Sequence, residues 1–218
     1  MTEAPIWVPS PNFGPRRGGA QPGLIVLHYT AMQTCDVALA RLCDPAAEVS
    51  AHYLISETGE IFQLVDEAQR AWHAGQGRWH EIDDVNSHSI GIELANMGDA
   101  PFPEPQMSAS EDLITAIMQR HGVAPEGVIG HSDMAPGRKS DPGPHFDWLR
   151  LERQGLARGR GRRDYTGPVD HSEFRRRAAM AGYTAEVDDK TLLKAVRLRY
   201  RSHAQGKLTA ADFKVLSD

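Results

Sequence analysis

The segment GHSDMAPGRKSDPG, residues 130–143, constrains the fold more than any other part of the chain. It holds one histidine, two aspartates, one arginine and one lysine, and it separates them with two prolines and three glycines. Unpaired charges are costly to bury, and this much Gly and Pro disfavours a regular helix or strand. The pattern therefore predicts a loop of fixed shape on which His131, Lys139 and Asp141 converge to form half of a site.

The length and composition exclude several classes of protein. The 218 residues suffice for one ordinary domain and a small second one, and the 24% of charged residues are typical of a soluble globular chain. No run of about 18 apolar residues predicts a membrane span. Residues 1–19 lack the apolar core of a secretory signal, so we expect a cytoplasmic protein. The net charge of −5 argues against nucleic acid as the main partner.

Hydrophobic patterns predict the elements that hold the other half of the site. Apolar runs and alternation indicate strands at 24–29, 51–56, 60–65, 89–95 and 127–129, with a hairpin turn at Gly59. A helix is expected from Thr34 to about Leu42, and a second one from a capping box at Ser108 to Gly122. Residues 66–88 show little periodicity and are predicted to form a long irregular loop.

The composition changes after Trp148. Six arginines predict a flexible linker over 150–164: Arg150, Arg153, Arg158, Arg160, Arg162 and Arg163. Three helical patterns follow in 165–218, starting near Asp170, near Asp188 and at Thr209. A three-helix bundle of this size is near the lower limit of independent stability.

The residue types of the converging loop suggest metal chemistry. Two histidines and one carboxylate with an open fourth position make a catalytic zinc site, and His28, at the end of a buried strand, completes a set with His131 and Asp141. Zinc lowers the pKa of its water to about 7 and polarises a carbonyl group. Amide hydrolysis also needs a proton carrier and a cation for the oxyanion. Glu93 and Lys139 have the residue types for these two roles.

Spacing alone leaves alternatives open. Three further histidines compete with His28 for the ligand position, namely His52, His73 and His88. Glu93 could equally face solvent from its strand, and Lys139 could be a solvated loop charge. Asp133 fits a turn cap better than a ligand.

Five segments resemble the zinc-dependent N-acetylmuramoyl-L-alanine amidases of the type-2 amidase family, which are related to T7-type lysozyme and peptidoglycan recognition proteins. They are LIVLHYT (24–30), VSAHYLIS with GEIFQLV (49–65), AWHAG (71–75), NSHSIGIELAN (86–96) and GHSDMAPGRKSDPG (130–143). The last is highly specific, because its histidine, its Arg-Lys pair and its Ser-Asp-Pro-Gly stand where the family has them. The presence of Glu93 favours the branch that contains AmpD and AmiD.

The resemblance implies a fold and a division of the chain. The expected fold class is α/β, with a central mixed β-sheet flanked by helices as in peptidoglycan recognition proteins. Residues 1–149 would form the catalytic domain, 150–164 the linker, and 165–218 a small three-helix peptidoglycan-binding-like domain.

The resemblance also implies roles for particular residues. One Zn²⁺ per chain would be held by His28, His131 and Asp141, with Glu93 as the catalytic acid and base and Lys139 as the stabiliser of the oxyanion. Five residues are expected to contact substrate: Trp72 and His73 in the pocket wall, and Asn86, Asn96 and Arg138. For the two asparagines, hydrogen bonds that order loops are the alternative.

The function implied is hydrolysis of the amide bond between N-acetylmuramic acid and L-alanine in muropeptides. Soluble 1,6-anhydro-muropeptides from cell-wall recycling are the expected substrates, and the enzyme is expected to be a monomer. One alternative is an envelope or lytic amidase acting on intact peptidoglycan, which the wall-binding type of tail favours. The other is a non-catalytic peptidoglycan-binding protein, but such proteins typically lack one or more metal ligands.

Overall fold

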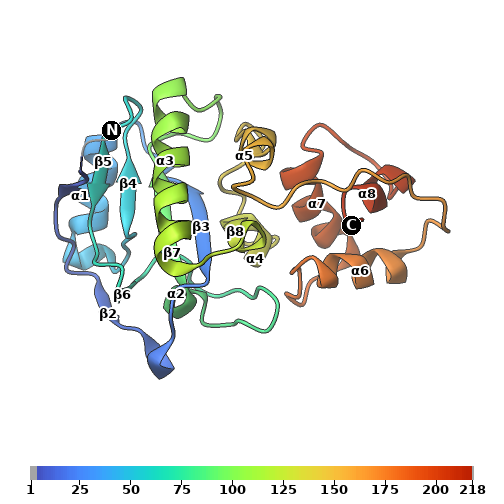
Figure 1. The fold of residues 1–218 in the computed structure, drawn as a ribbon, viewed down its shortest axis with the longest axis horizontal. Coiled ribbons are helices and arrows are strands. Elements are labelled where there is room, and N and C mark those ends of the chain that lie inside the picture. Colours follow the sequence, from blue (N-terminus) through green and yellow to red (C-terminus); the bar gives the residue numbers. More distant parts are fainter. Residues whose placement is uncertain (1–3, 218) are drawn as a thin grey trace.

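The computed structural model describes residues 4–217 and contains one mixed sheet beside a helical tail (Figure 1). The six-stranded sheet has the order β1 (Ile6–Trp7), β5 (Ile61–Gln63), β4 (Tyr53–Ile55), β7 (Ser89–Leu94), β3 (Leu24–Tyr29) and β8 (Val128–Gly130). A second, two-stranded sheet pairs β2 (Phe13–Pro15) with β6 (Gln69–Ala71). The expected α/β class with a central mixed sheet is confirmed.

Helices flank this sheet and form the tail. Those of the sheet region are α1 (Cys35–Cys43), α2 (Val85–His88), α3 (Glu104–His121), α4 (His131–Met134) and α5 (Trp148–Arg153). Those of the tail are α6 (His171–Met180), α7 (Asp189–Tyr200) and α8 (Ala210–Lys214). Short 3-10 turns occupy η1 (Arg17–Gly19), η2 (Pro45–Ala47) and η3 (Pro125–Gly127). No helix within residues 4–217 is long and apolar enough to cross a membrane.

The register of the central strands brings the predicted site residues to one edge. β3 runs parallel to both β7 and β8, and His28 is the direct neighbour of Glu93 across the β3–β7 pair. Leu27 is paired with Gly130, so the chain leaves β8 at His131 close to His28. Carboxyl ends of parallel strands are common places for sites, since neighbouring strands release their polar side chains there.

The strands that carry these residues are held by apolar burial on both faces. Alternate side chains of β3 point to opposite sides, and a parallel strand of this kind needs cover on each. One cluster joins Ile25 and Leu27 to α3 through Ile114. Another joins Val26 to tail residues such as Phe174, so the tail shares a hydrophobic cluster with the sheet.

The structure differs from the sequence-based predictions at two places in the sheet region: the start of α3 and the segment 66–88. α3 starts at Glu104, right after Pro103, and not at the capping box of Ser108, whose hydroxyl donates to the Glu104 carboxylate instead. A proline in the first turn suits a helix start, because that position has no intrahelical N–H bond to lose. Residues 66–88 are not wholly irregular, since they contain β6 and α2.

The tail contains the three expected helices. Asp170 and Asp188 accept hydrogen bonds from the first turns of α6 and α7, and Thr209 opens α8 with a capping box. α4 and α5 lie between the sheet and these tail helices (Figure 1).

The prediction of a linker over 150–164 is wrong for its first residues. α5 runs through the boundary, with Leu151 fully buried and Arg150 paired with Glu104 and Glu111 of α3. The local density of arginines indicated that Arg150 faces solvent, but its acidic partners lie some forty residues earlier in the sequence. The division into domains stays a prediction, and the residues 1–3 and 218 that it includes lie outside the described part.

A partly buried carboxylate connects α3 to the hairpin region. Glu67 accepts hydrogen bonds from the Tyr53 hydroxyl at 2.7 Å, from Arg120 at 2.6 Å and from His121 at 2.7 Å. Burial alone would raise the pKa of Glu67, but the hydrogen bonds from Arg120, His121 and Tyr53 outweigh it and lower that pKa to about 2.

Replacing Glu67 by Gln is expected to lower the free energy of unfolding by about 2 kcal/mol at pH 7, the scale of hydrogen bonds to a charged group. Because the pKa of Glu67 in the folded protein lies below its usual value of 4.5, the carboxylate stabilises the fold above pH 4.5, and this contribution is lost as pH falls towards about 2. Denaturant unfolding of wild type and Glu67→Gln across this range measures the effect, with exposed Glu126→Gln as control. A difference that does not change with pH would contradict the assignment.

Candidate active site

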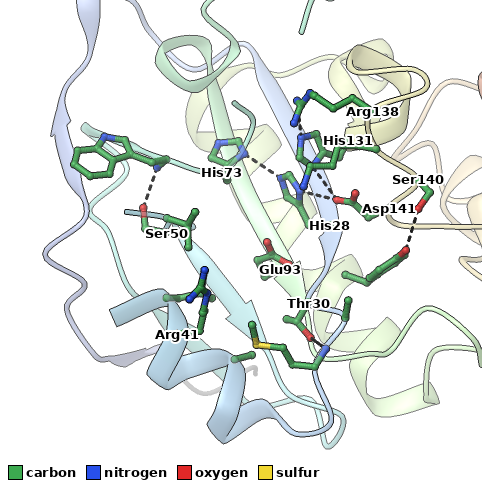
Figure 2. Close-up of a pocket in the computed structure, with 18 residues that line it drawn as sticks. His28, Thr30, Arg41, Ser50, His73, Glu93, His131, Arg138, Ser140 and Asp141 are labelled. Atoms are coloured by element: carbon green, nitrogen blue, oxygen red, sulfur yellow. Dashed lines mark hydrogen bonds and ion pairs between the residues drawn. The ribbon is translucent and has the colours of Figure 1, made fainter. Parts of the chain in front are cut away.

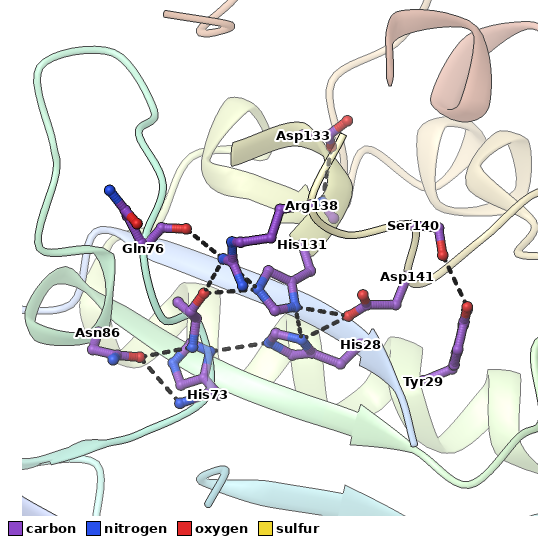
Figure 3. Close-up of polar contacts among 12 residues, drawn as sticks. His28, Tyr29, His73, Gln76, Asn86, His131, Asp133, Arg138, Ser140 and Asp141 are labelled. Carbon is purple, nitrogen blue, oxygen red and sulfur yellow. Dashed lines mark hydrogen bonds and ion pairs between the residues drawn. The ribbon is translucent and has the colours of Figure 1, made fainter. Parts of the chain in front are cut away.

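Three ligand-type atoms meet at the edge of the sheet. His28 Nδ1, His131 Nδ1 and Asp141 Oδ2 each lie 2.9 Å from the other two (Figure 3). All three residues are buried, with exposed fractions of 1%, 2% and 7%. Within residues 4–217 this is the one cluster of His, Cys, Asp or Glu whose ligand atoms converge in a way that could hold a metal ion.

The segment 130–143 brings two of these atoms together by folding back on itself. His131 opens the one-turn helix α4, and Ser132 N–H donates to the backbone carbonyl of Asp141 at 2.9 Å. The expectation of a loop throughout is therefore wrong for 131–134, and 131–136 is buried. The bend at Gly137 has a φ of 80°, which a residue without Cβ adopts without strain.

A chain of hydrogen bonds determines which nitrogen of His28 carries the proton. The Ser89 hydroxyl donates to the carbonyl of Val85 at 2.6 Å, so its oxygen accepts from His73 Nε2 at 3.1 Å. His73 Nδ1 is then an acceptor, and His28 Nε2 donates to it at 3.0 Å. A neutral His28 therefore directs the lone pair of Nδ1 towards His131 and Asp141.

The same reasoning applies to His131. Its Nε2 lies 2.8 Å from the carbonyl oxygen of Ala74, which can only accept, so Nε2 holds a proton, and the neutral form of this ring has its lone pair on Nδ1. Burial, followed by the neighbouring His131, lowers the pKa of His28 to about 4, so this ring is neutral near pH 7.

The protonation pattern supplies a test of whether a cation fits. When both imidazoles are neutral, which is the form that binds a metal ion, three lone pairs, one of them on a carboxylate, face one another at 2.9 Å. That arrangement is repulsive in a buried place unless a positive charge lies among them. The donor set and its protonation therefore fit a divalent metal ion, which is bound by neutral imidazole and ionised carboxylate.

Glu93 lies on β7 beside this cluster. Its Oε2 is buried and has no hydrogen-bond partner among residues 4–217. Burial, with a smaller contribution from the charge of Asp141, raises the pKa of Glu93 to about 8, while the charge of Lys139 opposes the rise. An unpartnered carboxyl group with a perturbed pKa beside a candidate metal site is typical of a catalytic acid or base. The roles expected for Glu93 and Lys139 stay predictions.

A pocket of about 440 Å³ opens over the cluster. Its wall includes Glu93, Lys139, Arg138, Trp72 and His73, as expected. Sequence analysis missed the far wall on α1, where Arg41 lies with Ala38 and Leu42 at helical spacing. Figure 2 shows Glu93 on the strand beside His28, and Arg41 on the side of the pocket away from the metal ligands.

Two of the residues expected to contact substrate, Asn86 and Arg138, form hydrogen bonds with the loop that follows Ala71. The side-chain oxygen of Asn86 accepts from the backbone N–H groups of His73 and Ala74 at 3.1 and 2.8 Å. Arg138 lines the pocket, but its guanidinium donates to the carbonyl groups of Ala74 and Gln76. These contacts hold the Ala74 carbonyl that orients His131.

Asn96 and the rival histidines also lie outside the metal cluster. The side-chain oxygen of Asn96 accepts from Gly98 N–H, and neither Asn96 nor Asn86 belongs to the described pocket wall. His52 Nδ1 accepts from Gly91 N–H and its Nε2 donates to the carbonyl of Gln69, so this ring connects strands. His88 Nδ1 donates to the carbonyl of Asp84. Asp133 accepts from Gly130 N–H, as expected for a turn cap.

Comparison with known proteins identifies the family. Residues 18–144 match the family model Amidase_2, described as N-acetylmuramoyl-L-alanine amidase. The chain belongs to this family. It is 35% identical over 209 residues to the N-acetylmuramoyl-L-alanine amidase AmiD of Escherichia coli, covering 82% of this chain and 74% of AmiD. It is 34% identical over 161 residues to the 1,6-anhydro-N-acetylmuramyl-L-alanine amidase AmpD of Citrobacter freundii, covering 66% of this chain and 86% of AmpD.

Solved structures agree with this assignment. The complex of AmiD from E. coli with the substrate anhydro-N-acetylmuramic acid-L-Ala-D-γ-Glu-L-Lys superposes with a TM-score of 0.81 at 31% identity, covering 94% of this chain and 95% of that one. AmpDh3 from Pseudomonas aeruginosa in complex with an anhydromuramic pentapeptide gives 0.82 at 31% identity, covering 92% and 91%. The resemblance to type-2 amidases is confirmed.

Replacing His28 or Asp141 by Ala is expected to remove stoichiometric divalent metal from the purified protein, because two remaining ligands bind far more weakly than three. Elemental analysis after dialysis measures the metal content. His88→Ala, a histidine outside the cluster, is the matched control and should keep its metal. A His28→Ala protein that still holds one metal ion per chain would show that the ligands lie elsewhere.

Proposed function

We propose that this chain is a zinc hydrolase that cleaves the amide bond between N-acetylmuramic acid and L-alanine in muropeptides, with 1,6-anhydro-muropeptides as the substrates. The observation that carries the proposal is the trio of lone pairs on His28, His131 and Asp141, open to a pocket that also holds an unpartnered Glu93. Two imidazoles and one carboxylate are a donor set that suits catalytic zinc. The anhydromuramyl ligands named for the AmiD and AmpDh3 structures support the substrate class.

The residues divide the work of hydrolysis among them. His28, His131 and Asp141 would hold a zinc ion, which would lower the pKa of a bound water to about 7 and polarise the scissile carbonyl group. Glu93 accepts a proton from the attacking water and passes it to the nitrogen of L-alanine as the C–N bond breaks. The products are a lactyl carboxylate on the sugar and a free amine on the peptide.

Charge around Glu93 makes the exchange of a proton feasible. Burial and, to a smaller extent, the charge of Asp141 raise the pKa of Glu93 to about 8, and a nearby dication would lower that pKa into the range where the carboxylate can both accept and return a proton. Lys139 lines the same pocket, and its ammonium group stabilises the oxyanion that forms on the carbonyl oxygen.

A second candidate is an amidase that acts on intact peptidoglycan. The AmiD and AmpDh3 structures cover 94% and 92% of this chain, whereas the AmpD match covers 66%. The match to AmiD and AmpDh3 therefore includes most of the tail. A tail resembling a peptidoglycan-binding domain favours a polymeric substrate.

Mass spectrometry of reaction products tests both candidates. Zinc-loaded protein is incubated with an anhydro-muramyl tripeptide and, separately, with intact sacculi. The proposal expects anhydro-N-acetylmuramic acid and a peptide with a free L-alanine amine, released faster from the soluble substrate. Faster release from sacculi would favour the second candidate, and cleavage of a different bond, or of neither substrate, would contradict the amidase assignment.

Glu93→Gln is the matched variant for this experiment, since it keeps the shape of the side chain and removes the carboxylate. It is expected to keep its zinc and to lose at least about 100-fold in turnover, the lower range for general acid–base catalysis. Unchanged turnover would remove Glu93 from the mechanism.

A further inference from the structure

Asp133 is a fully buried carboxylate two residues after the metal ligand His131, and residues of the tail hold it. Its Oδ2 accepts from Gly130 N–H at 2.8 Å and from Arg199 at 2.7 Å, and its Oδ1 accepts from the Tyr183 hydroxyl at 2.7 Å. The bond to Gly130 fixes the start of α4, which is the turn that presents His131. The bonds to Arg199 and Tyr183 come from the tail.

Arg199 forms hydrogen bonds with the chain on both sides of that turn. It is 5% exposed, pairs with Asp133 after the turn, and donates to the carbonyl of Val128 in β8 before it, at 3.1 Å. Its guanidinium lies 4.1 Å from the centre of the Trp148 ring, a cation–π contact that covers one face. A single side chain of α7 thus ties β8, α4 and α5 together.

The second bend of the same segment also lies against α7. A Cβ placed on Gly137 would come within 2.8 Å of the Thr191 side chain. Gly137 lies between His131 and Asp141 in the sequence, so α7 contacts the loop near both of its ligands. The loop that carries two of the three ligands therefore contacts the tail at two places, through Asp133 and at Gly137.

Removing Arg199 would leave Asp133 buried with an uncompensated charge. That situation is strongly unfavourable, and the turn would respond by moving or by admitting water. Metal sites tolerate displacements of only about 0.5 Å in their ligands. A shift of α4 would therefore move His131 Nδ1 away from His28 and Asp141.

We propose that α7 and the residue Tyr183 are positioning elements of the metal site, acting on His131 through Asp133 and thereby setting the affinity for zinc. The tail is then a structural part of the catalytic centre, beyond any contact with the cell wall. This inference rests on the zinc site of the proposed function.

Zinc dissociation constants of full-length variants test the proposal. The test variant is Arg199→Met, and the matched control is Arg197→Met on the same helix. Arg197 is 7% exposed and pairs with Asp212 of α8, so its loss breaks a buried ion pair confined to the tail. Chelator competition gives the zinc Kd, and thermal unfolding of the metal-free proteins gives their stabilities.

Both substitutions are expected to lower the unfolding temperature, but only Arg199→Met should weaken zinc binding, by about 10–100-fold as for other residues that support metal ligands. An unchanged zinc Kd in Arg199→Met, or an equal weakening in Arg197→Met, would overturn the proposal. Should Arg199→Met fail to fold, Tyr183→Phe removes a single hydroxyl from Asp133, and it must weaken zinc binding to a smaller extent for the proposal to stand.

His131→Ala separates a failure of this inference from a failure of the zinc site itself. If His131→Ala loses zinc while Arg199→Met binds it like wild type, the ligand assignment holds and the role of the tail is wrong. If His131→Ala keeps zinc, the site is elsewhere and the proposed function fails with it.

Discussion

The rest of the structure depends on one constraint: the buried ligand atoms of His28, His131 and Asp141 are held 2.9 Å from one another, with their lone pairs facing inward. Without a cation they repel one another, so the surrounding chain must hold them in place. The central strands do most of this, because β3 delivers His28 beside Glu93 and β8 releases His131 next to it. The order of the strands therefore determines the chemistry at the edge of the sheet.

Each ligand has its own support from the surrounding chain. His28 is oriented by His73, which is oriented in turn by Ser89. His131 is oriented by the carbonyl of Ala74, and its turn is fixed through Asp133 by the tail. Support of this kind selects the tautomer and the direction of each ring, which controls how well a metal binds.

Sequence reasoning succeeded where local pattern and tertiary role coincide. Apolar runs predicted β3 and β7, and side-chain caps predicted α1 and the three tail helices. Residue types suggested His28, His131 and Asp141 as a set of ligands, the family resemblance selected His28 over the rival histidines, and the structure brings these three residues together.

Sequence-based prediction was incomplete where the partner of a polar side chain lies many residues away in the sequence. Arg150 indicated a solvated linker, but Glu104 and Glu111 pair with it on α3. For Asn86 the sequence left substrate contact and loop ordering both open, and its side-chain oxygen accepts from the backbone N–H groups of His73 and Ala74. The bond between Asp133 and Arg199 spans 66 positions, and no local pattern indicates such a pair.

The protonation state of the three histidine rings in the metal-free protein tests the central claim most directly. Nitrogen-15 NMR of the imidazole groups near pH 7 distinguishes a protonated from an unprotonated ring nitrogen. We expect Nε2 to carry the proton on His28, His73 and His131, and we expect zinc to shift the Nδ1 signals of His28 and His131 without shifting that of His73 to a comparable extent. A proton on His28 Nδ1, or an unprotonated Nε2 on either His28 or His131, would contradict this arrangement.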